Sequence, residues 1–161
     1  MELTARPSDL IRRLQLAYSG ELGAAIAYVG HARSLGSRPE SADVQRIERE
    51  EREHRERMGQ MLAELGAGSD PWLELRNRLM GTTIATYCRI GGWFSPMYGA
   101  GRFERKNIVE YELLARAAVL CGQDDFVEPL LTMAEIEWDH EEFFRLKAAS
   151  HWLSQACKVV A

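Results

Sequence analysis

The stretch VQRIEREEREHRERMGQMLAEL, residues 44–65, is charged at most positions, yet its apolar residues recur at intervals of three and four. Residues spaced in this way share one face of a helix and form the seam of a helical bundle: Val44, Ile47, Met58, Met61 and Leu65. Between Ile47 and Met58 the same spacing passes through positions 51 and 54, which are Glu51 and His54 instead of apolar residues. The sequence therefore predicts a bundle helix whose buried face carries a carboxylate and an imidazole at its middle.

A later segment, expected to be helical from about Phe126 to Trp152, repeats this arrangement. Glu137 and His140, again three residues apart, take two seam positions among the apolar residues Phe126, Leu130, Met133 and Phe144. In the first expected helix, from a cap at Ser8 to about Leu35, the seam carries a single carboxylate, Glu21.

The helix expected from about Arg102 to Cys121 allows two apolar stripes, one containing Glu110 and the other containing Glu112. Glu110 lies about as far before the GQDD turn as Glu137 lies after it. In an antiparallel pair these two residues come level, because each residue advances the helix by about 1.5 Å. We therefore expect Glu110 on the buried face.

Asp70 followed by Pro71 predicts the start of one more helix, which runs to about Ile90. Two hairpins of long helices, from about Ser8 to Leu65 and from about Arg102 to Trp152, are thus joined by a long crossover that carries its own helix. No run of alternating β-branched residues indicates a sheet. We predict an all-α, ferritin-like four-helix bundle that spans residues 1–161 as a single domain.

The composition narrows the class of function. A net charge of −4 and a pI near 5.6 give no basic surface for nucleic acid. The three cysteines are far apart, which argues against a disulfide framework or a zinc ribbon. The first residues lack the apolar core of a signal peptide, so we expect a cytoplasmic protein.

Four buried carboxylates and two histidines need compensation, because desolvating unpaired ions costs many kcal/mol. One Glu from each of two helices and Glu-x-x-His from each of the other two form the ligand set of a two-metal carboxylate centre. Such oxygen-rich ligation suits Fe or Mn better than structural zinc. The alternative is a buried salt-bridge network. Tyr28 is a candidate hydrogen-bond partner of a ligand, whereas His31 and His151 are expected to be partly exposed.

Four stretches resemble the ferritin-like di-iron carboxylate proteins, in particular demethoxyubiquinone hydroxylase and more distantly rubrerythrin: GELGAAIAYVG at 20–30, EREH at 51–54, NIVEYE at 107–112 and EWDH at 137–140. The resemblance implies that two iron ions are bound by Glu21, Glu51, His54, Glu110, Glu137 and His140. It also implies a quinone-like hydrophobic substrate and peripheral contact of residues 80–100 with the inner face of a membrane.

These expectations favour a di-iron oxidoreductase that uses O2 and an external electron donor to hydroxylate a small hydrophobic substrate. Side chains expected to wall the substrate site are Met58, Met61, Met133 and Phe144. The alternatives are a ferroxidase or peroxide-detoxifying protein that handles iron, and a non-catalytic bundle that metal stabilises. A homodimer is a further expectation.

Overall fold

The computed structural model describes residues 6–157, and within that range every regular element is a helix. The long helices are α1 (Pro7–Leu35), α2 (Glu40–Glu64), α3 (Pro71–Tyr87), α4 (Phe94–Leu120) and α5 (Val127–Ala149). Two short 3-10 turns follow α4 and α5: η1 (Asp124–Phe126) and η2 (Trp152–Ser154). The predicted all-α class is confirmed.

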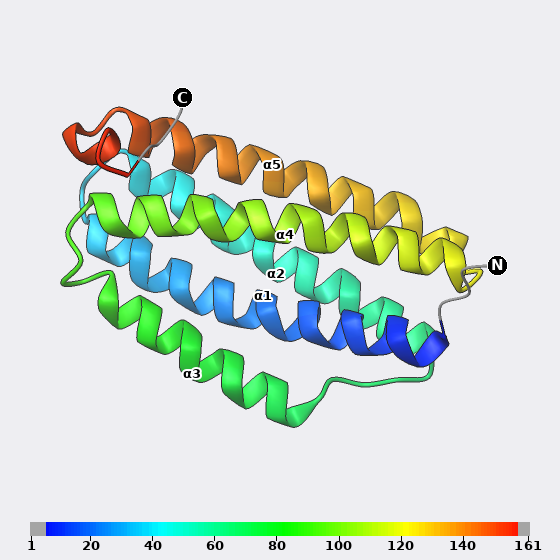
Figure 1. The fold of residues 1–161 in the computed structure, drawn as a ribbon. Helices are drawn as coiled ribbons and strands as arrows, with labels where there is room; N and C mark the ends of the chain where they lie inside the picture. Colours follow the sequence, from blue (N-terminus) through cyan, green and yellow to red (C-terminus); the bar gives the residue numbers. More distant parts are fainter. Residues whose placement is uncertain (1–5, 158–161) are drawn as a thin grey trace.

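The long helices form two antiparallel hairpins, α1 with α2 and α4 with α5, and α3 lies along the outside of α1 (Figure 1). Helices within a hairpin pack closely, whereas the two hairpins approach each other less closely. The space between the hairpins is filled by long polar side chains at mid-height, described below.

The crossover helix α3 is fixed at both its start and its middle. The Asp70 carboxylate accepts hydrogen bonds from the backbone N–H groups of Trp72 (2.9 Å) and Leu73 (3.2 Å), and Pro71 occupies the first turn, as the sequence predicts. Further along, a Cβ atom on Gly81 would lie 2.4 Å from the carbonyl oxygen of Gly23. Only glycine therefore allows α3 to approach α1 this closely.

The expected start of α4 at Arg102 is wrong. The helix begins at Phe94, inside the segment GGWFSPMYGAG that was expected to separate two helices. Pro96 is tolerated there because it falls in the first turn, where its missing N–H has no helical partner. The earlier start places Glu104 well inside α4. The buried face of the helix therefore packs against the bundle from Met97 onward.

Two apolar clusters occupy the two ends of the bundle. Near the α2–α3 connection, Leu10, Leu14, Met58, Leu62, Leu114, Phe126, Leu130 and Met133 pack together. Near the α1–α2 connection, the cluster consists of Tyr28, Leu35, Val44, Ile47, Met97 and Phe144 with their neighbours. These clusters hold the four long helices in register on both sides of the polar layer.

Candidate metal centre

Helices α2 and α5 direct the four residues of the repeated motif into the bundle. Glu51, Glu137 and His140 are fully buried and His54 is 3% exposed. Their positions follow from the seam pattern, since each pair replaces two apolar residues between buried ones such as Ile47 and Met58.

Helices α1 and α4 each add one buried carboxylate. Glu21 of α1 is buried, as the sequence predicts. The carboxylate from α4 is Glu104, which is 0% exposed. The predicted Glu110 is instead on the surface, where its side chain is 46% exposed and pairs with Lys106 at 3.1 Å. Glu112 is exposed as well.

The expectation that Glu110 lies on the buried face is wrong, because its distance from the turn fixes its height along α4 but not its direction. The buried stripe of α4 runs through Gly101, Glu104, Asn107, Tyr111, Leu114 and Ala118. Glu110 and Glu112 flank Tyr111 and are turned about 100° away from it on either side. Glu104 shares the stripe with Tyr111, and this spacing of seven is the signal that could have identified it.

The six buried residues form two overlapping groups. One group consists of Glu21, Glu51, His54 and Glu137, and the other of Glu51, Glu104, Glu137 and His140; the candidate ligand atoms within each group lie within 4.8 Å of one another. Glu51 and Glu137 belong to both groups. Each group therefore has one histidine, one carboxylate of its own and two shared carboxylates.

Burial and mutual proximity shift the pKa values of the groups in this cluster. Burial raises the pKa of Glu21 above its usual value, and burial together with the neighbouring carboxylates raises the pKa of Glu51 and Glu104 well above it. Burial also acts on Glu137, but the neighbouring imidazoles of His140 and His54 outweigh it and lower its pKa to about 2. The pKa of His54 is raised, because Glu137 and Glu21 outweigh the effect of its burial.

Buried polar atoms without a hydrogen-bond partner gather at the same place. In the described part of the chain they include both carboxylate oxygens of Glu51, one oxygen each of Glu21 and Glu137, Nε2 of His54 and Nδ1 of His140. Unpaired buried polar atoms are costly and are rare in folded proteins. Carboxylate oxygens and imidazole nitrogens that converge in this way fit cation ligands.

Two tyrosines hold the carboxylates of α1 and α4 in a crossed arrangement. Tyr28 of α1 donates a hydrogen bond to Glu104 of α4, while Tyr111 of α4 donates one to Glu21 of α1 at 2.5 Å. Each tyrosine follows the glutamate of its own helix by seven residues. Tyr28 is thus a partner of a candidate ligand, as the sequence predicts.

Two further contacts orient the cluster, and the sequence alone indicated neither of them. Asn107 donates a hydrogen bond to Glu104 at 3.1 Å, and Nε2 of His140 lies 2.7 Å from a carboxylate oxygen of Glu50. Glu50 in turn accepts a hydrogen bond from Arg46. A carboxylate behind a histidine ligand fixes which ring nitrogen faces the metal.

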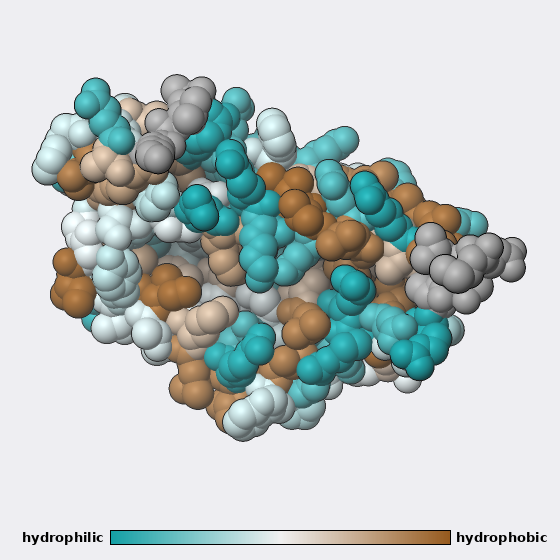
Figure 2. All heavy atoms as spheres, viewed as in Figure 1, coloured by the Kyte–Doolittle hydropathy of each residue, from teal (hydrophilic) through white to brown (hydrophobic). Residues whose placement is uncertain are grey.

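Two cavities adjoin the cluster on the side of α1, α3 and α4. The smaller, of about 260 Å³, is bordered by Tyr28 and by apolar side chains, and Figure 2 shows the surface hollowed between α3 and α4. The larger, of about 630 Å³, reaches Glu21 and Tyr111 and has Arg13, Arg76 and Lys106 among its lining residues.

The expected cavity walls differ from the observed ones. Met58, Met61 and Met133 lie in the apolar cluster near the α2–α3 connection, and Phe144 lies in the opposite cluster. None of the four lines either cavity. His31, expected to be partly exposed, is only 2% exposed because α3 covers this part of α1.

Comparison with known proteins adds no relative, since no family model, curated protein or solved structure matches this chain. The chemistry of the cluster is therefore inferred from its own residues. Four carboxylates and two imidazoles, arranged as two groups with two shared members, could hold a pair of cations.

Proposed function

We propose that this chain is a di-iron carboxylate oxidoreductase that uses O2 to hydroxylate a small hydrophobic substrate. The observation that carries the proposal is the pair of ligand groups that share Glu51 and Glu137. Two divalent ions would neutralise the four carboxylates of the cluster. One imidazole and several carboxylates per ion suit iron or manganese, and we favour iron because the resemblance of the sequence to di-iron carboxylate proteins implies it.

In this proposal Glu21 and His54 would hold one ion, Glu104 and His140 would hold the other, and Glu51 and Glu137 would be shared by both sites. When bound, the iron pair supplies the redox chemistry with O2. The chain holds the ligands in place. Tyr111 fixes one oxygen of Glu21 and leaves the other without a protein partner, whereas Tyr28 and Asn107 each donate a hydrogen bond to one oxygen of Glu104.

Apolar residues surround the cluster at the two ends of the bundle and on the side of the smaller cavity. Apolar clusters close the bundle above and below it, and the smaller cavity beside Tyr28 presents mainly alanine, glycine and aromatic surfaces. An apolar substrate in this cavity would lie against the Tyr28–Glu104 pair. Exclusion of water favours attack on the substrate over loss of the oxidising equivalents.

Hydroxylation with O2 requires a partner that delivers electrons. One oxygen atom enters the C–H bond of the substrate and the other leaves as water, which takes up two protons. The substrate provides two of the four electrons that reduce O2, and the other two must come from an external electron donor. The proposal therefore includes a donor protein or a small-molecule reductant.

Handling of iron as a substrate is the main alternative. The larger cavity leads to Glu21, which would give ferrous ions a route to the cluster. However, Arg13, Arg76 and Lys106 lie along it, and among the described residues at its surface only Glu110 offsets these charges. A cationic passage disfavours Fe²⁺ as the molecule that enters, so the organic substrate remains the better proposal.

Single-turnover experiments separate these functions. The protein would be loaded anaerobically with ferrous iron, mixed with 2-naphthol as a probe and exposed to ¹⁸O2. A hydroxylase incorporates ¹⁸O into the aromatic probe, whereas a ferroxidase oxidises many equivalents of added Fe²⁺ without labelling it. A metal-stabilised, non-catalytic bundle does neither, and that result would reject the proposed activity.

A membrane surface is the proposed partner of α3. Exposed apolar side chains run along this helix and past its end: Trp72, Leu75, Leu79, Ile84 and Ile90. Arg76 and Arg78 are exposed among them, which suits anionic lipid headgroups. Within the expected contact at 80–100, Phe94 and Met97 are buried, whereas Trp72 and Leu79 before it are exposed, so we place the proposed contact along α3 from Trp72.

No helix in the described residues is both long enough and apolar enough to cross a bilayer, so the contact would be peripheral. Flotation with vesicles containing anionic lipid tests it. Wild-type protein should float and a Trp72→Ser, Leu79→Ser variant should not. If the wild type stays at the bottom and sediments as a dimer through the same face, the membrane proposal is wrong and the expected homodimer explains the surface.

A further inference from the structure

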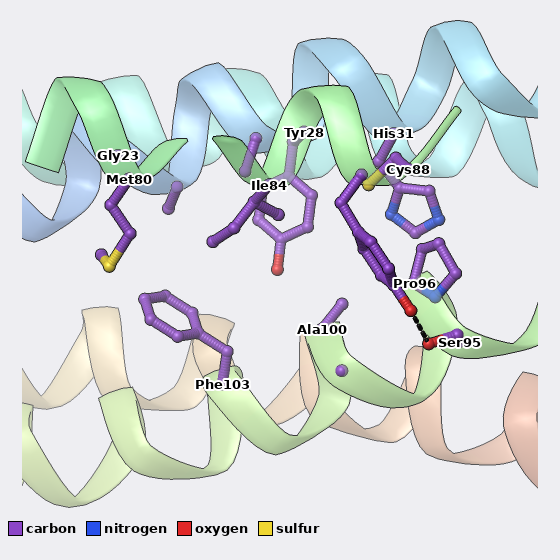
Figure 3. Close-up of a pocket in the computed structure, with 14 residues that line it drawn as sticks. Gly23, Tyr28, His31, Met80, Ile84, Cys88, Ser95, Pro96, Ala100 and Phe103 are labelled. Carbon is purple, nitrogen blue, oxygen red and sulfur yellow. Dashed lines mark hydrogen bonds between the residues drawn. The ribbon is translucent and has the colours of Figure 1, made fainter. Parts of the chain in front are cut away.

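The smaller cavity lies between α1, α3 and α4 and contains one polar group without a partner (Figure 3). Its walls are formed mainly by small and apolar side chains, among them Ala24, Ala27, Ile84, Pro96 and Phe103. Within the described part of the chain, no charged side chain lines it. A charged ligand would find no counter-ion here, so the cavity suits a neutral and largely apolar molecule.

His31 is the exception to this apolar lining. Its side chain extends from α1 into the cavity, near Cys88 and Pro96, and its Nε2 atom is buried without a hydrogen-bond partner (Figure 3). The ring stacks against Tyr28 and Phe144, with centroid distances of 6.5 and 6.0 Å. These contacts hold the imidazole in place but leave Nε2 unsatisfied.

The other polar groups of the cavity are already engaged. Tyr87 and Ser95 share a hydrogen bond of 2.6 Å, and the Tyr28 hydroxyl donates to Glu104. Burial lowers the pKa of His31 to about 4, so that the imidazole is neutral near pH 7. A neutral imidazole offers one donor and one acceptor, which suits a hydroxyl or carbonyl group and not an ion.

We propose that His31 is the polar anchor of this cavity and binds the single hydroxyl or carbonyl oxygen of an otherwise apolar ligand through its imidazole. His31 and Tyr28 lie one helical turn apart, about 5 Å along α1. A ligand held at His31 therefore extends past Tyr28, and its carbon atoms lie beside the Tyr28–Glu104 pair. His31 is thus a positioning residue that selects which part of the ligand faces the metal centre.

The role of this ligand as substrate rests on the proposed function, whereas its binding does not. The two are separated by measuring equilibrium binding in the metal-free protein as well as the iron-loaded one. The probes are 2-naphthol and 2-methylnaphthalene, which have nearly the same shape but differ in one hydrogen-bonding group. Wild-type protein should bind 2-naphthol about three- to tenfold more tightly, the range expected for one net hydrogen bond.

His31→Leu should abolish this preference while 2-methylnaphthalene binds as well as before, and His31→Gln should keep part of it. His151→Leu is the matched control, because His151 stacks on Trp93 and Phe94 and does not line the cavity. Ala100→Phe fills the cavity and should weaken the binding of both probes. This result would show that the probes bind in the cavity.

Equal binding of the two probes to the wild type, or a preference that survives His31→Leu, would overturn the proposal. Absence of binding to the wild type would do so too. If the preference is present but the protein binds no iron, the oxidoreductase proposal fails and the anchoring role of His31 stands.

Discussion

The buried cluster of carboxylates and histidines has two sides that differ in their surroundings. On the side of α2 and α5, which we call the closed side, Glu51, His54, Glu137 and His140 are packed inside the bundle and none of them lines either cavity. On the side of α1 and α4, the open side, each carboxylate is held by a tyrosine of the other helix. Both cavities lie on this open side.

This difference separates two tasks of the site. The closed side supplies both histidines and both shared carboxylates, so it should determine whether cations are retained. The open side supplies one terminal carboxylate per ion, together with the surfaces that a substrate would contact. Changes on the closed side should therefore remove metal, whereas changes on the open side should alter access and reactivity more than metal content.

The largest effect is expected from Glu137→Ala on the closed side. Because Glu137 belongs to both ligand groups, its removal should eliminate both iron ions, which metal analysis after reconstitution would detect. Glu135→Ala is the control, since Glu135 is two residues away on the exposed face of α5. A Glu137→Ala protein that keeps two irons would show that the carboxylate is not shared.

A second effect concerns the stability of the metal-free protein. The pKa values of Glu21, Glu51 and Glu104 are raised in the folded state, mainly by burial, so folding favours their protonated forms. Their contribution to the free energy of unfolding is fully present below the ordinary pKa of 4.5. It is lost as the pH rises through their pKa values in the folded protein. Glu137, with a pKa of about 2, acts oppositely, and its contribution is lost below pH 4.5.

The free energy of unfolding of metal-free protein should therefore fall between pH 5 and pH 8, by at least about 1 kcal/mol, which corresponds to less than one pKa unit in a single group. Urea denaturation across this range measures the effect. Bound metal should remove it, because cations replace protons on the carboxylates. A metal-free protein that is equally stable at both pH values would contradict the charge balance inferred for the cluster.

The smallest effect is expected on the open side, from Tyr111→Phe. Loss of the hydroxyl removes the 2.5 Å hydrogen bond to Glu21 but leaves every ligand in place. Iron affinity should fall by about tenfold, the lower end of the range for outer partners of metal ligands, with two ions still bound at saturation. Competition with a chelator measures this. Tyr18→Phe, whose ring contacts Arg55 outside the cluster, should leave affinity unchanged.

The two sides also differ in how well the sequence predicted them. The closed side was predictable because each helix carries two polar residues three apart on an apolar seam. Glu51 and His54 both occupy seam positions, so the spacing places both side chains on the buried face. Glu21 was predictable from the seam of α1. Glu104 was missed because the expected start of α4, at Arg102, placed it in the first turn. In the first turn no earlier buried residues of the helix exist to show which face a side chain shares.

Features that depend on packing between distant segments could not be predicted in the same way. The burial of His31 follows from the close approach of α3 to α1, which small residues such as Gly81 and Gly30 allow but do not by themselves specify. The cavity walls likewise depend on where α3 lies. The methionines of the seams were reasonable candidates, yet they fill the end of the bundle instead.

The central claim, that two cations are bound by a site to which α4 contributes Glu104, is tested most directly by iron stoichiometry in a matched pair of variants. After anaerobic reconstitution and gel filtration, wild-type and Glu110→Ala proteins should each retain two irons per chain. Glu104→Ala should retain one at most, because only one of the two ligand groups includes Glu104. Two irons in Glu104→Ala, or a loss in Glu110→Ala, would contradict the account.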